Sequence, residues 1–279
     1  MKFLLLSNQM RITIKHIIVT IFLTSLLSPC IAYCQQISDS LSNDLSHREL
    51  NICDDTDLQF TKFKAKQLIL PGALMITGLI GVIDSDNNLN KSVRDAMTGL
   101  SNNKVCKIDD YLRFLPSASH LVMGSLGIKS RHNFKERFLI SATAHAAMLI
   151  MGYGMKYAFH EQRPDFSDNH SFPSGHVAFA FTGAELLRSE YGTAYGIAGY
   201  AVATGVAFLR LYNNRHWFND VLMGAGIGIL SAKIGCWLLP FERKILKINR
   251  KYNNSSTVAL APAYDVFNKS CMITLNAVF

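Results

Sequence analysis

Charged residues are scarce in this sequence: they make up 17% of its 279 residues, whereas hydrophobic residues make up 49%. That balance excludes an intrinsically disordered chain, which needs many charges and few apolar residues. The formal charge is +8, but no basic run is interleaved with aromatic residues. The sequence therefore predicts no nucleic-acid partner, and its modest basic excess is typical of proteins that meet a membrane surface or anionic substrates.

Metal-binding patterns are also missing. The six cysteines show no spacing typical of a metal site, and no cluster of histidine, cysteine and carboxylate residues suggests one. We therefore predict neither a metal nor a cofactor. A disulfide between Cys53 and Cys106 would require both residues to face the same oxidising compartment. Nothing in the sequence indicates an oligomeric state.

The first 34 residues predict a signal peptide or an N-terminal anchor. Basic residues up to Lys15 precede an apolar run over residues 17–32, and the polar Gln35 follows. Residues 35–65 include a polar, acidic stretch and predict an exported linker.

The next part of the chain, residues 66–240, predicts an all-α fold: a bundle of about six helices embedded in a membrane. Its apolar segments lie at 68–83, 111–128, 138–155, 177–187, 194–211 and 221–239. Only the last segment reaches the roughly 20 residues that span hydrocarbon comfortably. Residues 241–279 form a basic segment and a tail, and the alternation of apolar residues over 271–279 predicts a short C-terminal β-hairpin.

The polar motifs described next lie between these segments, and their orientation depends on how many segments cross. If Gln35 is outside, the loop over 156–176 faces outward only when one earlier segment fails to span. The second segment is the weakest, because Asp109, Asp110 and Arg113 stand at its start. Residues 84–136 would then face inward, as the positive-inside rule expects. The alternative is a periplasmic helical bundle that rests on a membrane and does not span it.

The first motif holds Lys156 and Arg163, which are seven residues apart and would project from one helix face. Pro164 would end that helix. Two cations at a helix mouth can bind one phosphate in different ways, since arginine offers a planar fork and lysine a point charge. A solvated basic face is the alternative.

The second motif, Pro-Ser-Gly-His at 173–176, precedes an apolar run and predicts a helix start. The unpaired amides of a helix start bind anions, and Gly175 lets a ligand approach the backbone. His176 would lie in the first turn and point at that anion. A plain structural loop is the alternative for this motif alone.

The third motif contains Arg210, a predicted turn at residues 213–214, and His216 four residues before Asp220, which would place the carboxylate one turn along the same helix face. A carboxylate that accepts from one imidazole nitrogen fixes the tautomer and leaves the other nitrogen free to attack. His216 is therefore a candidate nucleophile, and a helix-capping or surface pair is the alternative.

In this order and spacing, the three motifs resemble the signature of the type 2 phosphatidic acid phosphatase and vanadium haloperoxidase superfamily. The resemblance is tight over residues 156–220, and the helix pattern extends it to about 66–240. One departure is Leu209, where the family usually has serine before the third-motif arginine. That difference puts in doubt one hydrogen bond near the phosphate, not the nucleophile.

The resemblance implies a role for each matching residue. His216 forms a phosphohistidine, Asp220 orients its ring, and His176 protonates the leaving oxygen and then deprotonates the attacking water. The groups that stabilise the phosphate oxygens are Lys156, Arg163, Arg210 and the backbone at Ser174 and Gly175. Such a site needs no metal, because phosphoryl transfer asks mainly for positioning and positive charge.

We therefore expect a membrane-bound phosphatase with its site facing the periplasm or exterior. It would act on a lipid phosphate or diphosphate, such as phosphatidic acid, phosphatidylglycerophosphate, undecaprenyl diphosphate or a lipid A phosphate. The alternatives are a soluble periplasmic acid phosphatase, a vanadium-dependent haloperoxidase, and a non-catalytic phosphate-binding membrane protein. We interpret His145 as a bonded core residue and Met148, Met151 and Met155 as packing.

Overall fold

The computed structural model describes residues 63–83, 88–101 and 105–246, and the backbone of 257–265 and 270–278. The predicted signal, nearly all of the predicted linker, and Cys53 lie outside these residues. In chain order the elements are the 3-10 helix η1 (Ala65–Leu68), α3 (Ile69–Ile83), α4 (Asn88–Ser101), α5 (Asp109–Leu112), α6 (Leu115–Val122), the 3-10 helix η2 (Met123–Leu126), α7 (Phe134–Phe159), α8 (Gly175–Tyr191), α9 (Thr193–Tyr212), α10 (Phe218–Ile245), β1 (Thr257–Asp265) and β2 (Ser270–Val278).

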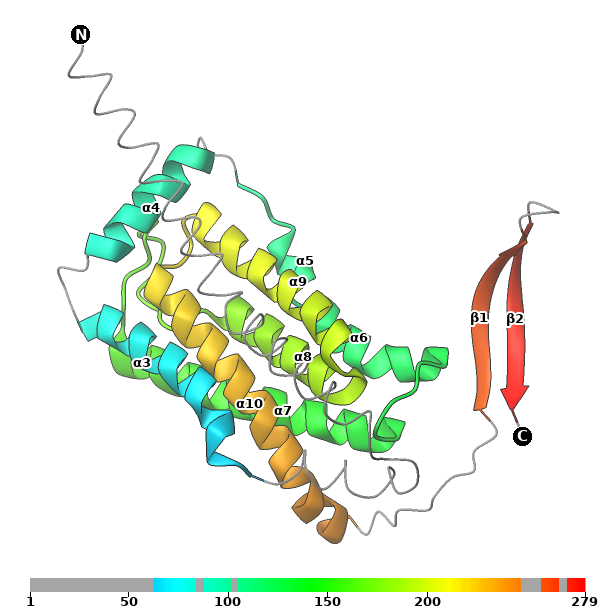
Figure 1. The fold of residues 1–279 in the computed structure, drawn as a ribbon. Helices are drawn as coiled ribbons and strands as arrows, with labels where there is room; N and C mark the ends of the chain where they lie inside the picture. The colour runs from blue at the N-terminus through cyan, green and yellow to red at the C-terminus, as the bar shows by residue number, and fades with distance from the viewer. Residues whose placement is uncertain (1–62, 84–87, 102–104, 247–256, 266–269, 279) are drawn as a thin grey trace, which may run out of the picture.

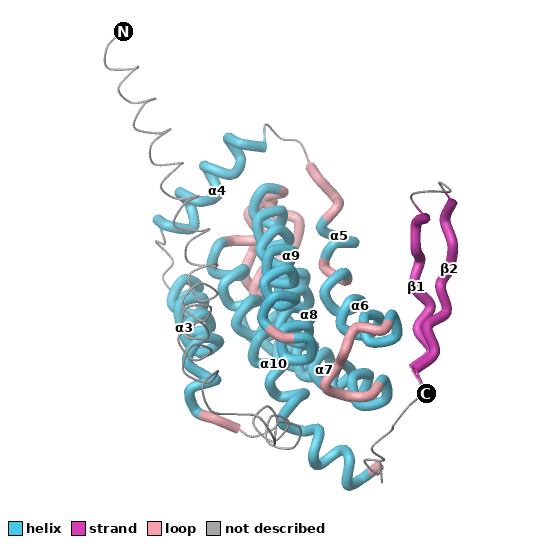
Figure 2. Tube along the Cα trace, turned by 45° about the vertical axis from the view of Figure 1, so that its right-hand side comes forward, coloured by secondary structure: helices cyan, strands magenta, loops and turns pink. Residues whose placement is uncertain are grey.

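Helix α10 is the central helix of the bundle (Figures 1 and 2). It packs against α3, α7 and α8, and α8 packs in turn against α9. Small residues allow these close crossings: a Cβ added to Gly228 would lie 2.5 Å from the carbonyl oxygen of Ala178 on α8. The prediction of an all-α core is therefore confirmed, and its packing depends on glycine where α10 meets α8.

The long helices alternate in direction, so the three motifs gather at one end of the bundle. Helices α7 and α9 end there, and α8 and α10 begin there; the backbone N–H of Ser174 donates to the carbonyl oxygen of Asp220 over 3.1 Å. We call this the motif end. The opposite end, where Tyr191 finishes α8, is called the far end.

Helix α3 runs antiparallel to α10 and starts at the far end. Trp237, late in α10, donates its indole N–H to Gln67 over 3.1 Å. At the other end of α3, a Cβ on Gly78 would meet Asn219 and Met223, early in α10. Residue 65 therefore lies at the opposite end of the bundle from the motifs.

The second apolar segment is broken into α5, α6 and η2, and it runs the length of α8. At its start Asp110 bonds to His176 at the motif end, and at its finish the backbone N–H of Gly124 donates to the Tyr191 hydroxyl over 2.9 Å at the far end. Residues 84–136 were expected to lie on the opposite side of the membrane from the motifs. That expectation is wrong for the residues up to α5, because α5 lies at the motif end. Contacts across the bundle, invisible in the local sequence, hold α5 beside the motifs.

Helix α4 also lies at the motif end, beside α9 and α10 (Figure 1). It buries Val93, Ala96 and Met97, and Asn90 donates its side-chain amide to Asn219 over 2.8 Å. The guanidinium of Arg94 lies 5.6 Å from the Trp217 ring, within the range of a cation–π contact. This polar, amphipathic helix therefore covers the first turn of α10.

Among the described residues, four helical stretches are long and apolar enough to cross a membrane: Ala65–Ile83, Phe134–Phe159, Thr193–Tyr212 and Phe218–Ile245. The expectation that only the last apolar segment reaches 20 residues is wrong, since α7 has 26 residues and α9 has 20. Isoleucines on the outward face of α3 stay exposed in the isolated chain, with Ile69 at 69% and Ile83 at 71%. Exposed apolar surfaces of this kind are suited to contact with lipid. Together with the candidate spans, they are typical of a multi-pass membrane protein.

The two C-terminal strands form the predicted hairpin. β1 and β2 pair antiparallel, with Thr257 opposite Val278 and Asp265 opposite Ser270. The predicted packing roles also hold inside the core. His145 bonds to Ser117 and to the carbonyl oxygen of Ser141, and Met148 is buried against α8 and α10.

Candidate phosphoryl-transfer site

The third motif places an imidazole against a buried carboxylate. α9 ends at Tyr212, and Asn214 adopts a positive φ of 56°, so the chain turns where the sequence predicted. His216 precedes α10 and does not lie on it. Its Nδ1 is 3.2 Å from Oδ2 of Asp220 in the first turn, and only 4% of His216 is exposed.

Asp220 holds the ring in one tautomer. A carboxylate only accepts, so Nδ1 of His216 carries the proton and Nε2 has the free lone pair. Nε2 has no hydrogen-bond partner within the described parts of the chain. Burial, set against the contact with Asp220, lowers the pKa of His216 to about 4. The ring is therefore neutral near pH 7 and has the form that a nucleophile requires.

The same Asp220 oxygen has two further donors. The hydroxyl of Ser171 lies 2.5 Å from Oδ2, and the backbone N–H of Trp217 lies 2.8 Å from it. The second contact also caps the start of α10. The carboxylate is thus fixed by its own helix and by the loop that precedes the second motif.

His176 lies in the first turn of α8, as predicted, with both ring nitrogens engaged. Its Nε2 is 2.9 Å from Oδ1 of Asp110, and its Nδ1 is 3.3 Å from Nη1 of Arg113. Because arginine only donates, Nδ1 accepts, and the proton is on Nε2. Burial, followed by the charge of Arg210, lowers the pKa of His176 to about 4. The ring is therefore neutral before a phosphate binds.

The first motif differs from its prediction in one respect. α7 ends at Phe159, where His160 takes a left-handed conformation with φ 46°, so Arg163 does not share a helix face with Lys156. Both still reach the motif end. Nζ of Lys156 donates to the carbonyl oxygen of His170 over 2.7 Å, and Nε of Arg163 pairs with Asp168 over 2.8 Å.

Arg210, at the end of α9, uses only part of its guanidinium group in hydrogen bonds within the protein. Its Nη1 donates to Asp109 over 2.7 Å, whereas its Nε is buried without a partner in the described residues. Ser174, which precedes α8, likewise has a buried hydroxyl for which the described chain offers no partner. A Cβ built on Gly175 would meet open space. Unused donors beside open space are what an incoming phosphate needs.

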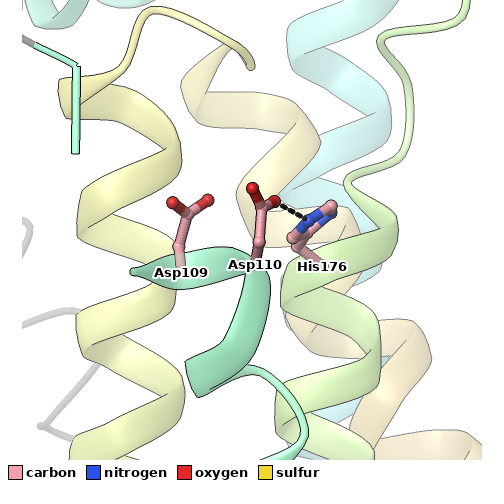
Figure 3. A group of neighbouring side chains, drawn as sticks. All are labelled: Asp109, Asp110 and His176. Atoms are coloured by element: carbon pink, nitrogen blue, oxygen red, sulfur yellow. Dashed lines mark hydrogen bonds and ion pairs between the residues drawn. The ribbon is translucent and has the colours of Figure 1, made fainter. Parts of the chain in front are cut away.

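Asp109, Asp110 and His176 form a compact group whose possible ligand atoms lie within 4.8 Å of one another (Figure 3). In this arrangement a carboxylate pair could hold a metal ion. However, Arg210 and Arg113 already contact the group, and their charges oppose a divalent cation. The group's chemistry therefore suits an anion site in which acids hold the arginines in place.

Several contact residues were missed from the sequence. In the sequence Asp109, Asp110 and Arg113 stand out only as charges that weaken a membrane span, and no motif includes Ser171. Their partners lie far along the chain: 101 residues separate Asp109 from Arg210, and 66 separate Asp110 from His176. The paired acids in a short polar stretch were the one available signal.

The electrostatics tie the motifs together. The charges of Arg210 and Arg163 help to lower the pKa of His216, and the charge of Arg210 helps to lower the pKa of His176. The structure thus brings every predicted site residue to one end of the bundle: His216, His176, Asp220, Lys156, Arg163, Arg210, Ser174 and Gly175.

Part of the chain is similar to known proteins. Residues 137–244 match the family model of the PAP2 superfamily. Over 155 residues the chain is 37% identical to the lipid A 1-phosphatase of Porphyromonas gingivalis, an alignment that covers 54% of this chain and 35% of that protein. The chain thus spans about a third of that curated relative.

Two solved structures are also similar. Aquifex aeolicus LpxE is 22% identical, with a TM-score of 0.39 over 50% of this chain and 92% of that one. The PAP2-type phosphatidylglycerolphosphate phosphatase of Bacillus subtilis is 20% identical, with a TM-score of 0.45 over 65% of this chain and 98% of that one.

Proposed function

The chain belongs to the PAP2 superfamily, and we propose that it is a metal-independent phosphatase that hydrolyses a lipid phosphate through a phosphohistidine on His216. The observation that carries the proposal is the buried His216–Asp220 pair, set among three cations from different elements, with a neutral ring whose Nε2 has no partner among the described residues. A binding protein without catalysis would not need a nucleophile held in this form.

In the first step, Nε2 of His216 attacks phosphorus. The bond between phosphorus and the lipid oxygen breaks and the electron pair stays on that oxygen. His176, which has become an imidazolium on phosphate binding, gives that oxygen a proton and returns to the neutral form. In the second step, His176 takes a proton from water while the water attacks phosphorus. The N–P bond then breaks, its electron pair returns to His216, and inorganic phosphate leaves.

Substrate binding would prepare His176 for its part as an acid. Burial and the charge of Arg210 hold its pKa at about 4 in the free protein. A phosphate dianion between Arg210 and the ring would offset that charge and raise the pKa of His176. His176 would therefore hold its second proton while the phosphate is bound. Acid catalysis by His176 is in this way coupled to substrate binding.

The cations would supply the charge stabilisation that magnesium supplies elsewhere. Lys156, Arg163 and Arg210 come from the end of α7, the following loop and the end of α9. The Nε of Arg210 and the hydroxyl of Ser174, which have no partner in the described part of the chain, add donors. Preorganised groups of this kind stabilise charge that develops in a transition state.

A lipid substrate is favoured because the site lies at the end of helices with membrane-span character. The similarity to a lipid A 1-phosphatase favours a phosphate on lipid A over the other candidates, namely phosphatidic acid, phosphatidylglycerophosphate and undecaprenyl diphosphate. A soluble acid phosphatase or a vanadium haloperoxidase would have no use for such helices.

The direct test is phosphate release by purified protein in detergent from a panel of these lipids, with and without EDTA. We expect turnover of at least one lipid phosphate that survives chelation, and none in His216→Ala. An enzyme that chelation inactivates and magnesium restores would refute the metal-independent mechanism. Faster turnover of p-nitrophenyl phosphate than of any lipid would refute the substrate class.

We further infer that the motif end faces the periplasm or exterior. Basic residues flank the spans at the far end and would face inward under the positive-inside rule: Lys64, Lys66, Lys129, Arg131, Lys135, Arg243 and Lys244. In a cysteine-free background, Asn169→Cys at the motif end should react with a membrane-impermeant thiol reagent in intact cells, whereas Lys244→Cys at the far end should not. Equal labelling of both would support a periplasmic bundle.

A further inference from the structure

The two oxygens of Asp220 have very different surroundings. Oδ2 accepts from Ser171, Trp217 and His216. Oδ1 is equally buried, yet no donor nitrogen or hydroxyl reaches it among the described residues. A buried carboxylate oxygen without a donor is costly, so a hidden donor is expected.

A candidate donor is Glu161, in the loop between Lys156 and Arg163, whose side chain lies beside the first turn of α10. Its carboxyl oxygens lie 3.3 and 3.4 Å from the amide nitrogen of Asn219, the residue before Asp220, which brings the carboxyl groups of Glu161 and Asp220 within reach of a hydrogen bond. The carbonyl oxygen of Glu161 accepts from the backbone N–H of Ser171 over 2.9 Å. Main-chain and side-chain contacts thus fix Glu161 beside the catalytic carboxylate.

Two carboxyl groups can share a hydrogen bond only if one of them carries a proton. Asp220 already accepts from three donors at Oδ2 and lies near the charge of Lys156. For Glu161, burial and the neighbouring Asp220 charge raise the pKa to about 9. The proton therefore resides on Glu161 near neutral pH.

We propose that Glu161 is a positioning residue whose protonated carboxyl donates to Oδ1 of Asp220 and keeps Oδ2 turned toward His216. The role rests on the phosphatase function proposed above and refines it. Glu161 does not touch the phosphate; it acts through Asp220. Neither the three motifs nor their spacing identifies it, because it falls at an unspecified position inside the first motif.

A dependence on pH follows. Of the charged groups around the pair, Asp220 on α10 acts on Glu161, and Lys156 on α7 acts on Asp220. When Glu161 loses its proton above a pH of about 9, it repels Asp220 and leaves Oδ1 without its donor. The orientation of His216 should then be lost, and kcat should fall on the alkaline side.

The experiment compares Glu161→Gln, Glu161→Ala and the control Gln162→Ala, whose side chain is exposed in the same loop. Glutamine keeps an N–H donor but cannot lose a proton, so this variant should retain most of the kcat at pH 7 and lack the alkaline fall. Alanine should lower kcat about tenfold with little change in KM. The control should match the wild type throughout.

Two results would overturn the role: an inactive Glu161→Gln in a folded, soluble protein, or an alkaline limb identical to that of the wild type. A readout independent of turnover is infrared spectroscopy. The deuterium-sensitive C=O band of a protonated carboxyl should be present in the wild type and absent in Glu161→Gln. If the wild type releases no phosphate from any lipid, the proposed function fails, whereas the infrared comparison still decides where the proton lies.

Discussion

Replacing Asp220 with asparagine removes the charge beside the proposed nucleophile and nearly preserves the shape of the side chain. The amide oxygen can still accept from Ser171 and from the Trp217 N–H, which lie 2.5 and 2.8 Å from Oδ2 in the wild type. We therefore expect Asp220→Asn to fold and to place His216 almost correctly. What it lacks is the negative charge that stabilises the imidazolium of the phosphohistidine.

The magnitude follows from the geometry. Nδ1 of His216 lies 3.2 Å from Oδ2 of Asp220, and both side chains are buried. Opposite charges about 4 Å apart interact by about 4 kcal/mol at an effective dielectric constant of about 20, and each ~1.4 kcal/mol is tenfold in rate. Asp220→Asn should therefore lower kcat by about a thousandfold with little change in KM.

The assay is steady-state phosphate release from the best lipid of the panel, with thermal unfolding measured in parallel. Asp95→Asn is the matched control, because it makes the same substitution on the exposed face of α4 and should leave kcat unchanged. A loss of less than tenfold in Asp220→Asn would show that the charge does not stabilise the intermediate. That result would remove the main reason for assigning His216 as the nucleophile.

Three further outcomes are expected. Because the pKa of His216 is about 4 and an imidazolium cannot attack, kcat/KM should fall tenfold per pH unit below about pH 4; a fall that begins near pH 6.5 would contradict this. In Gly224→Ala the new Cβ would lie 2.6 Å from the carbonyl oxygen of Ser174. The free energy of unfolding should therefore fall by about 1–3 kcal/mol, and activity should drop. Gly205→Ala, which meets no atom within 4 Å, is its control. Vanadate should inhibit competitively without added metal, and inhibition that requires added magnesium would count against a cage of protein cations.

The sequence predicted those parts of the fold and site that depend on local spacing. The Pro-Ser-Gly-His start of α8, the turn before His216 and the contact with Asp220 all lie within a few residues of their signals. The end of α7 was placed wrongly at Pro164, because His160 adopts a left-handed cap one turn earlier.

The rest depends on packing between distant elements. No local pattern brings Asp110 to His176 or Glu161 to Asp220, since helix packing decides which loops meet at the motif end. The broken second segment could be recognised as a poor span. Its path along α8 could not, because that path is fixed by contacts such as Gly124 with Tyr191.

The direction of α3 restricts the compartment in which the N-terminal region can lie. Its first turn lies at the far end, beside Trp237, and its last turn lies near Asn219. If α3 crosses the bilayer, residue 65 and His216 face different compartments, and a polar linker cannot bring an exported Gln35 back across. Export of Gln35 and an outward-facing His216 are then compatible only when α3 does not cross. Labelling from outside at both Gln35→Cys and Asn169→Cys would thus identify a bundle housed wholly in the periplasm.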